Sequence, residues 1–186
     1  MVSLNRIVMQ KKSRALIRAL HPERLEVAEI SGKWGRQFPF RSYERFLYPT
    51  HDICAGPVLG ADGAPRQFDL VMANQVWEHL DRPYAATRHV LQMLRPGGHF
   101  WVAVPFHIPF HAAPTDCSRW TARGLKNLLI EAGFAEDAIS ADQWGNRAAA
   151  LRNLEPDWPP EHAPETDDLT NDPEFPLVSW AIARKG

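Results

Sequence analysis

The chain has 186 residues, of which 45% are hydrophobic and 23% charged, and this composition suits one globular domain with a sizeable core. Its formal net charge is −1, which argues against a nucleic-acid partner because nucleic-acid binders usually carry a basic patch or stripe. The two cysteines lie far apart and lack C-x-x-C spacing, which argues against a disulfide scaffold and a structural zinc site.

Residues 1–20 mix apolar and basic side chains and contain no uninterrupted apolar core. This pattern predicts an amphipathic helix with a basic outer face, and it is typical neither of a signal peptide nor of a membrane span. A basic amphipathic helix can also rest on an anionic membrane surface or on an acidic partner, so this alternative stays open. By default we expect a cytoplasmic protein without a transmembrane segment.

The segments that follow are expected to begin a parallel sheet. Residues 25–30 form a short β-prone run between His-Pro and Ser-Gly, which predicts the first strand, followed by the loop SGKWG. Between residues 35 and 48, Pro39 and a group of aromatic residues indicate a turn or an irregular helix. The segment 51–54, HDIC, is expected to end another strand, and residues 56–67 contain enough Gly and Pro to form a surface loop.

The most specific segment covers residues 68–105 and reads FDLVMANQVWEHLDRPYAATRHVLQMLRPGGHFWVAVP. It predicts a buried strand over 68–73, a polar loop, an amphipathic helix from Pro83 to about Arg95 that Pro-Gly-Gly stops, and a second buried strand over 99–104. This order is a βαβ crossover, and ligands of open α/β sheets bind beyond the carboxyl ends of such strands. The polar residues at that position are Asn74, Gln75, Glu78 and His79.

The remaining residues are expected to complete the sheet. Thr121 is placed to cap a helix that Gly133 ends, and a strand then leads to a polar turn in which Trp144 is expected to be a core anchor rather than a lid. Residues 147–175 are rich in Pro and acidic side chains, which indicates an exposed insertion before a final strand over 177–185. We expect a single domain over residues 1–186, without internal repeats.

The strand ending in FDLV, the Val-x-Glu-His step and the LRPGG turn resemble the fourth-strand to fifth-strand unit of class I S-adenosylmethionine-dependent methyltransferases of the small-molecule type. The resemblance extends from about Leu25 to Asn146. It implies an α/β, three-layer Rossmann-like methyltransferase fold, mostly parallel with an antiparallel last strand. Only about thirty residues separate Gly35 from Phe68, so we expect the first half of this fold to be shortened by a strand–helix unit.

The same resemblance places Glu29 to Gly35 at the family's acidic residue and glycine-rich loop. Glycine lets the main chain approach a ligand closely, and backbone N–H groups at a helix start favour a carboxylate. Ser31 and Lys33 stand where the common pattern has glycines, and Lys33 could point outward, hold the cofactor carboxylate or fill the pocket. The residues implied in binding S-adenosylmethionine are Glu29, Ser31, Gly32, Gly35, Asp52, Asn74, Gln75 and Val76.

Asp52 is the implied partner of either the ribose hydroxyls or the adenine amino group, and Glu44 is the other acid nearby. For catalysis, His79 or His111 could accept a proton from an oxygen or nitrogen nucleophile near neutral pH. The alternative is that Glu78 caps a helix and His79 packs beside it.

The run PFHIPFHAAPTDCSRWT lies where members of the resembling family build much of the acceptor pocket. A His-x-x-x-His pair with a nearby Asp can bind a metal on a helix, but three prolines argue against a continuous helix here, so no metal is expected. Arg119 suits a carboxylate or phosphate, or it pairs with Asp116 and holds the loop. The expected substrate-binding residues are His107, Asp116, Arg119 and Trp120.

These observations predict an enzyme that transfers a methyl group from S-adenosylmethionine to a small polar acceptor with an oxygen or nitrogen nucleophile. The main alternative is a methyltransferase-like binding or scaffold protein that has lost productive cofactor binding, because the first half is short and the glycine loop departs from the pattern. A nicotinamide oxidoreductase is disfavoured because G-x-G-x-x-G is missing. The expected partner is a small-molecule acceptor, without nucleic acid, and a homodimer is possible.

Overall fold

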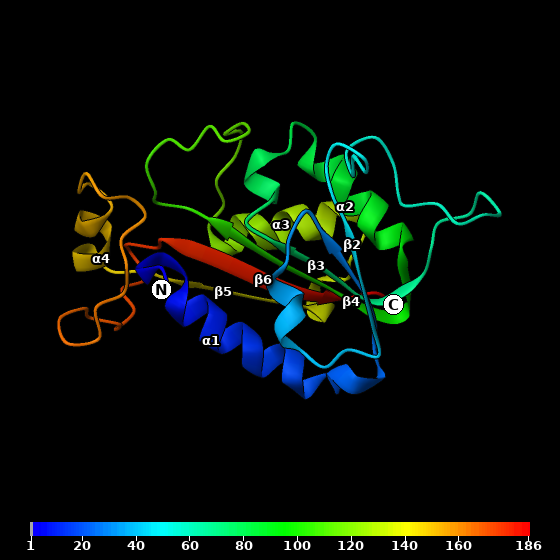
Figure 1. Cartoon of the computed structure of the whole chain (residues 1–186), viewed down its shortest axis with the longest axis horizontal. Coiled ribbons are helices and arrows are strands. Elements are labelled where there is room, and N and C mark those ends of the chain that lie inside the picture. The colour runs from blue at the N-terminus through cyan, green and yellow to red at the C-terminus, as the bar shows by residue number, and fades with distance from the viewer. Residues whose placement is uncertain (1) are drawn as a thin grey trace.

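The computed structural model describes residues 2–186 and shows one twisted sheet covered by helices on both faces (Figure 1). Six strands form the sheet in the order β2-β1-β3-β4-β6-β5. Their bounds are β1 Glu26–Ile30, β2 Ser42–Phe46, β3 Phe68–Asn74, β4 Leu94–Pro105, β5 Ile139–Trp144 and β6 Val178–Arg184.

The first four strands pair in parallel, whereas β6 runs antiparallel to both β4 and β5. A single strand, β2, lies between β1 and β3 along the described chain, and it occupies the edge of the sheet. The predicted fold class is therefore confirmed, including its antiparallel last strand and its shortened first half.

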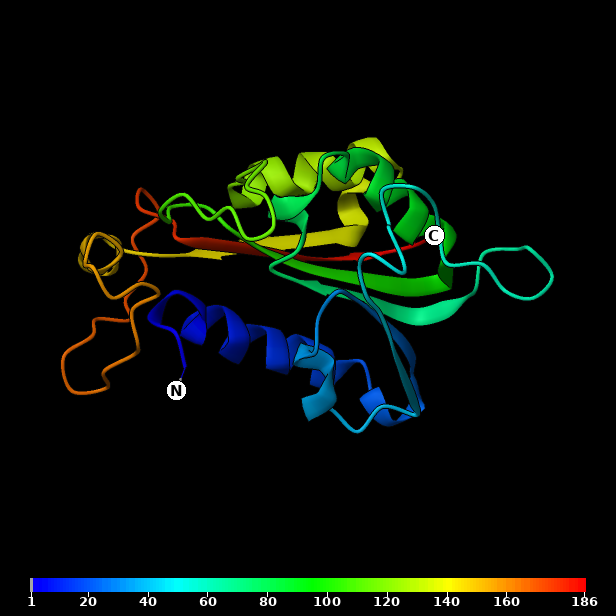
Figure 2. The same cartoon turned by 45° about the horizontal axis from the view of Figure 1, so that its top comes forward.

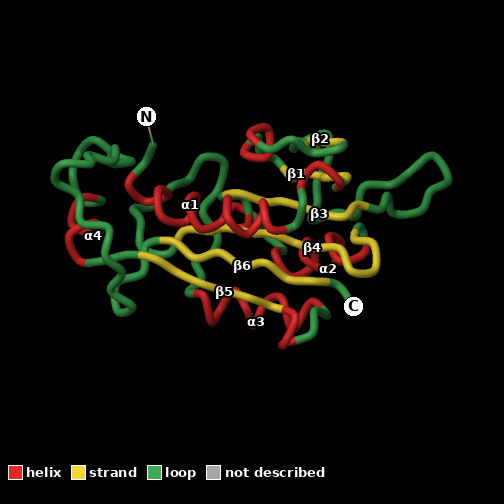
Figure 3. The backbone as a smooth tube through the Cα atoms, turned by 90° about the horizontal axis from the view of Figure 1, so that it is seen from below, coloured by secondary structure: helices red, strands yellow, loops and turns green. Residues whose placement is uncertain are grey.

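The α-helices of the described chain are α1 Leu4–Ala19, α2 Pro83–Gln92, α3 Ala122–Ala132 and α4 Arg147–Arg152, of which the first three pack on the sheet. Figure 2 shows α1 and the short helical turns that follow it beneath one face, with α2 and α3 side by side above the other. Viewed from below, α1 runs across the middle strands, and α4 lies beyond the end of the sheet among the loops of the C-terminal third (Figure 3). Short 3₁₀ turns cover Pro22–Arg24, Trp34–Gln37, Trp77–His79 and Glu136–Ala138.

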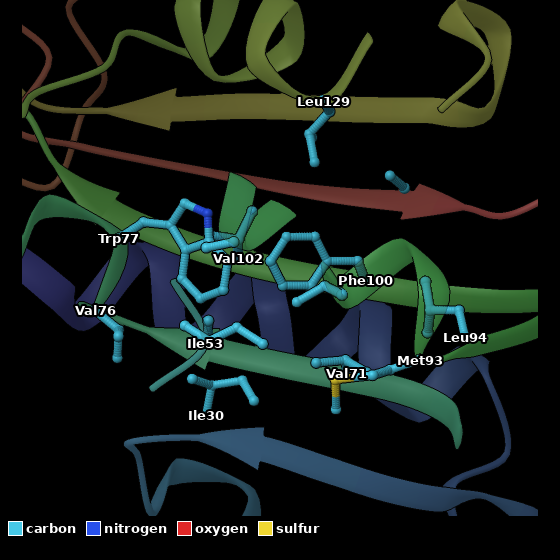
Figure 4. Close-up of a cluster of buried hydrophobic side chains, with 14 of the residues drawn as sticks. Ile30, Ile53, Val71, Val76, Trp77, Met93, Leu94, Phe100, Val102 and Leu129 are labelled. Atoms are coloured by element: carbon cyan, nitrogen blue, oxygen red, sulfur yellow. The ribbon is translucent and has the colours of Figure 1, made fainter. Parts of the chain in front are cut away.

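Alternation along the central strands divides the core into two clusters, because successive side chains of a strand point to opposite faces. Phe100 and Val102 of β4 pack beneath α2 and α3 together with Val71 and Leu129, a cluster that Figure 4 shows. Their neighbour Trp101 points to the α1 side, where its indole N–H donates to Ser13 Oγ at 3.1 Å.

The N-terminal helix is amphipathic, as predicted, and its apolar side is used within the fold. Leu4, Met9 and Ile17 are fully buried against the sheet, while Lys11 and Arg18 are exposed. The apolar side is therefore covered by the sheet, and the basic side faces outward.

Two local predictions between β1 and β3 are corrected by the structure. The segment 51–54 forms turns instead of ending a strand, because Asp52 turns its carboxylate back onto the Cys54 N–H at 2.9 Å. The strand of this region is β2 at the sheet edge, whose first four residues alternate between exposed and half-buried positions and whose last residue, Phe46, is buried. It lies inside the stretch where we expected a turn or an irregular helix.

The crossover and the C-terminal third have the predicted order of elements, with one correction and one addition. Helix α2 ends at Gln92, and Pro96-Gly97-Gly98 lies inside β4, which already begins at Leu94, instead of stopping the helix. Residues 95–98 bulge out of β4, since Phe68 faces Leu94 and Leu70 already faces His99. The insertion begins with the short helix α4, which Asn146 caps by accepting from the Ala149 N–H. Trp144 is 1% exposed and is the core anchor that we expected. Within residues 2–186, no helix is long and apolar enough to cross a membrane.

The N-cap of α3 provides a direct test of a predicted local interaction. Thr121 Oγ1 accepts from the Gly124 N–H at 3.1 Å, and Gly133 ends the helix in the left-handed conformation. We expect Thr121→Ala to lower the free energy of unfolding by about 1 kcal/mol, because one N–H of the first turn loses its partner. Urea denaturation measures this change, and Thr166→Ala in an exposed loop is the control that should unfold like the parent.

Candidate active site

A cavity of about 550 Å³ opens at the carboxyl ends of β1, β2 and β3. Its volume falls within the roughly 300–1,000 Å³ range of small-molecule pockets in proteins. It lies where the sequence placed a ligand site, and four of the residues predicted to contact the cofactor line its wall, together with the predicted base His79: Ser31, Asp52, Gln75 and Val76.

The buried carboxylate of Glu29 fixes the loop after β1 by hydrogen bonds. Glu29 is fully buried and accepts from the N–H groups of Trp34 and Gly35 at 2.8 and 2.7 Å, and from Tyr43 Oη at 2.5 Å. Burial raises the pKa of the Tyr43 phenol, and its hydrogen bond to Glu29 raises this pKa further. Glu29 therefore shapes the loop and does not line the cavity.

The two glycines of this loop make room for Glu29. A Cβ at Gly32 would lie 2.0 Å from Glu29 Oε1, and a Cβ at Gly35 would lie 2.5 Å from the Tyr43 ring. The carboxylate cannot move aside freely, because three donors fix it. The glycines thus permit a compact loop, and direct contact of these positions with a cofactor stays a prediction.

The two bulky residues of the loop leave the cavity open. Lys33 is exposed, and Trp34 stacks on Trp101 with ring centroids 4.5 Å apart, on the face of the sheet that α1 covers. Neither residue lines the cavity, so of the three positions considered for Lys33 the structure shows the outward one. Ser31 takes the place of a glycine with φ of 50°, a left-handed conformation that a glycine adopts more easily.

Of the acids that the sequence indicated for the cofactor, Asp52 lines the cavity, and the structure adds Asp81, which lines it too. One carboxylate oxygen of Asp52 accepts from the Cys54 N–H, and the other makes no hydrogen bond to a described residue. Glu44, the other acid considered, forms a two-pronged pair with Arg66 on the outer surface, and this contact lowers the Glu44 pKa. Of the two acids considered, Asp52 and not Glu44 is therefore placed to contact ribose or adenine, and this contact stays a prediction.

His79 is oriented by the loop that follows β4. Its Nδ1 lies 2.5 Å from the Thr115 carbonyl oxygen, which can only accept, so Nδ1 carries the proton. Nε2 of the neutral ring is then free to accept a proton. The ring of His111 packs edge-on against His79, with centroids 5.1 Å apart, and burial lowers the pKa of His111.

A second, smaller cavity of about 20 Å³ lies beside the first and shares Gln75 with it. Its wall includes Glu78, whose side chain is buried and whose Oε2 has no hydrogen-bond partner among the described residues. Burial raises the pKa of Glu78 to about 7. Arg6, from the first turn of α1, lines the same cavity. We did not expect Arg6 at the site, because a basic residue in an amphipathic helix carries no signal of its own.

The loop at 106–120 is held mainly by its own contacts. Arg119 forms a two-pronged pair with Asp116, which also accepts from the His111 N–H at 2.7 Å. The sequence left open whether Arg119 binds a substrate or pairs with Asp116 and holds the loop, and the structure shows the pairing. The pairing lowers the pKa of Asp116. His107 is exposed, and Trp120 packs against the core on the α2–α3 side. The structure places His111 at the wall of the smaller cavity. Asp116 and Arg119 line neither cavity and instead hold the loop that carries His111.

The fold and the position of this site define a Rossmann-like α/β protein with its ligand cavity at the carboxyl rim of the sheet. The model of the methyltransferase-domain family matches residues 21–138, and the chain belongs to this family. Members of the family use S-adenosylmethionine, so the chain is a probable S-adenosylmethionine-dependent methyltransferase. A search of curated protein sequences gave no significant match.

Solved structures with a similar fold include several methyltransferases of low sequence identity. A 1,6-didemethyltoxoflavin-N1-methyltransferase from Burkholderia thailandensis has a TM-score of 0.60 and 14% identity over 95% of this chain and 77% of its own. A possible histamine N-methyltransferase from Thermotoga maritima has a TM-score of 0.57 and 11% identity over 98% of each chain. An S-adenosylmethionine-dependent methyltransferase from Mesorhizobium loti has a TM-score of 0.55 and 18% identity over 92% of this chain and 96% of its own.

The residues present suit this cofactor. The larger cavity combines a carboxylate oxygen of Asp52 that is free to accept from hydroxyl or amino groups with the apolar side chains of Ile53, Val76 and Leu80, which suit an adenine ring. Asn74, the last residue of β3, lines neither cavity, but its Oδ1 is buried without a hydrogen-bond partner in the described chain. The site thus offers both polar and apolar contacts at the ends of adjacent strands.

Proposed function

We propose that this protein transfers a methyl group from S-adenosylmethionine to an oxygen or nitrogen nucleophile of a small polar acceptor. The observation that supports this most directly is the open cavity of about 550 Å³ at the rim of β1, β2 and β3, which Asp52 and His79 both line. Membership of the methyltransferase-domain family supplies the class of reaction.

In this proposal the chain acts mainly by alignment. The bound cofactor supplies an activated methyl group, and the protein must hold the nucleophile in line with it and remove a proton where one is present. Ser31, Asp52 and Val76 would hold the cofactor, while Glu29 keeps the loop in shape. His79 and His111 are the residues predicted to accept the proton, and His79 Nε2 is free for this role.

The scaffold alternative rests on the loop EISGKWG, whose Ser31 and Lys33 depart from the common pattern. Since Lys33 is exposed and Trp34 stacks on Trp101, this departure does not fill the cavity. Isothermal titration calorimetry with S-adenosylhomocysteine separates the two proposals. We expect binding in the micromolar range or tighter, and silence at millimolar ligand would favour the scaffold.

The same titration tests the assigned role of Asp52. We expect Asp52→Asn to weaken S-adenosylhomocysteine binding roughly tenfold, because a hydrogen bond to a charged acceptor contributes about 1.5–3 kcal/mol and the amide replaces only part of it. The amide oxygen can still accept from Cys54, so the turn should persist. Asp62→Asn, which alters a similar turn on the distant loop, is the matched control. Equal affinity in both variants would remove Asp52 from the cofactor site.

Location in the cytoplasm, the absence of nucleic-acid binding and a homodimeric state remain predictions. Gel filtration with light scattering would measure the oligomeric state directly.

A further inference from the structure

The smaller cavity concentrates unsatisfied polar atoms. Of the five buried side-chain atoms without a hydrogen-bond partner in residues 2–186, three belong to residues that line it: Ser3 Oγ, Gln75 Nε2 and Glu78 Oε2. Buried polar atoms are normally paired, since leaving one unpaired costs about 1–3 kcal/mol. Three unpaired atoms around one space therefore indicate that something polar occupies it during function.

Arg6 adds a cation without a partner. Its guanidinium forms no hydrogen bond or ion pair with the described residues, although it lines the cavity beside Glu78. Burial lowers the pKa of Arg6, and the Glu78 charge acts in the opposite direction. A half-buried guanidinium usually binds a carboxylate or another oxygen acceptor, and here the nearest carboxylate lies beyond ion-pair distance.

The donors and acceptors around this space suit a hydroxyl group. Arg6 and Gln75 Nε2 can donate to its oxygen lone pairs, and Glu78 Oε2 can accept its proton. An ammonium group could donate to Glu78 Oε2 and Ser3 Oγ but would share the space with the Arg6 cation. A neutral amine has one nitrogen lone pair and cannot accept from both Arg6 and Gln75. The volume of about 20 Å³ is that of a single water-sized group, so the space takes the reacting substituent and not a whole acceptor molecule.

The two cavities adjoin at Gln75, so that an acceptor group in the smaller one would lie next to a cofactor in the larger one. Gln75 lines both, and its neighbours Glu78 and His79 face the smaller and the larger cavity respectively. His111 lines the smaller cavity and its ring packs against His79. A group in the smaller cavity is therefore next to whatever fills the larger one.

We propose that the smaller cavity is the acceptor subsite, that it takes a hydroxyl group rather than an amine, and that Glu78 accepts the hydroxyl proton. This proposal rests on the proposed function and narrows its acceptor to an oxygen nucleophile. The hydroxyl oxygen bonds to the methyl carbon while the carbon–sulfur bond breaks and sulfur keeps the electron pair. The hydroxyl proton passes to Glu78 Oε2 and later to water.

Glu78 has a suitable proton affinity for this step. Burial raises its pKa to about 7, while the charges of Arg6 and Arg119 lower it and Asp116 raises it. His79 Nε2 lies 3.8 Å from Glu78 Oε1, and His111 is the other titratable group on the loop that covers this site. A base whose pKa is near the working pH combines availability with proton affinity.

Binding and turnover of phenol, aniline and anisole test the proposal, because these probes share one ring and differ in one substituent. With protein saturated by S-adenosylhomocysteine, calorimetry should show binding of phenol, at least tenfold weaker binding of aniline and none of anisole. Arg6→Met should weaken phenol binding roughly tenfold, whereas Arg18→Met on the exposed side of α1 should leave it unchanged. Aniline binding as tightly as phenol, or no phenol binding at millimolar concentration, overturns the assignment.

Glu78→Gln separates proton transfer from binding, because the amide can still accept a hydrogen bond but cannot take up the proton. With S-adenosylmethionine and phenol, kcat should fall about 100-fold or more while KM changes less than threefold. Glu131→Gln on the exposed side of α3 is the control. Unchanged kcat in Glu78→Gln overturns the role of Glu78 and returns it to His79 or His111.

Urea denaturation at two pH values checks separately that the Glu78→Gln variant folds. The pKa of Glu78 is higher in the folded protein, about 7, than its ordinary value of 4.5. The free energy of unfolding therefore falls as pH rises from about 4.5 to about 7, because the folded state must then hold a buried charge. The variant should therefore have a higher urea midpoint than the parent at pH 8 and a similar one at pH 5. If S-adenosylhomocysteine does not bind, the proposed function fails, and phenol binding to the free protein still tests the subsite.

Discussion

Glu29→Gln is expected to lower the free energy of unfolding by about 3 kcal/mol and to abolish detectable binding of S-adenosylhomocysteine. The carboxylate accepts from the Trp34 and Gly35 N–H groups and from Tyr43, all in a space without solvent. Glutamine keeps one acceptor oxygen but turns an NH₂ group toward one of the remaining donors. Two donors then face each other in the interior, which is worse than the loss of one hydrogen bond.

Urea denaturation and calorimetry measure the two effects separately. Glu131→Gln, which makes the same chemical change on the surface of α3, should behave as the parent in both. If Glu29→Gln unfolds as the parent does but no longer binds the ligand, Glu29 contacts the cofactor directly instead of shaping the loop. Normal stability together with normal binding would contradict both roles.

Gly145→Ala is expected to destabilise the protein by at least about 3 kcal/mol, because the added methyl has no free space. A Cβ at this position would lie 2.0 Å from the Phe175 carbonyl oxygen and 2.5 Å from the Leu177 nitrogen. Both are main-chain atoms, so a change of side-chain rotamer cannot relieve the overlap. The turn after β5 would have to separate from the start of β6.

Gly56→Ala is the matched control, since a Cβ there meets no atom within 4 Å. Differential scanning calorimetry of the two variants compares the same chemical change in a closed and an open environment. A melting temperature of Gly145→Ala within 2 °C of the control would mean that the β5–β6 region rearranges at little cost, contrary to this expectation.

The crossover from β3 to β4 was predictable because each of its steps has a strong local cause. The strands are largely apolar runs and Pro83 starts the helix, although the helix ends at Gln92 and Pro96-Gly97-Gly98 lies in the bulge of β4 instead of stopping the helix. Edge strand β2 lacked such signals, because Ser42, Glu44 and Arg45 are polar and SYERF is neither an apolar run nor a strict alternation. The segment gains its order from pairing with β1. The turn at Asp52 was missed because the short segment HDIC is compatible both with a strand end and with a turn in which Asp52 accepts from the Cys54 N–H.

At the site, the sequence indicated the residues that follow strand ends, and Ser31, Asp52, Gln75, Val76 and His79 do meet around one cavity. It could not indicate Arg6, whose position depends on how α1 packs across the sheet. The sequence also could not distinguish residues that hold the loops of the site from residues that line its cavities. The hydrogen bonds of Glu29 and the pairing of Asp116 with Arg119 show that these residues hold the loops.

The insertion between β5 and β6 reaches back to the start of α1. The Leu4 N–H donates to the Pro160 carbonyl at 2.9 Å, Asn5 and Asn153 exchange two hydrogen bonds, and Trp158 lines the smaller cavity. The wall of this cavity therefore comes partly from segments that lie outside residues 21–138, the part that the family model matches. If the smaller cavity is the acceptor subsite, as proposed, substitutions in these segments would alter the choice of acceptor in this protein without touching a residue that lines the larger cavity.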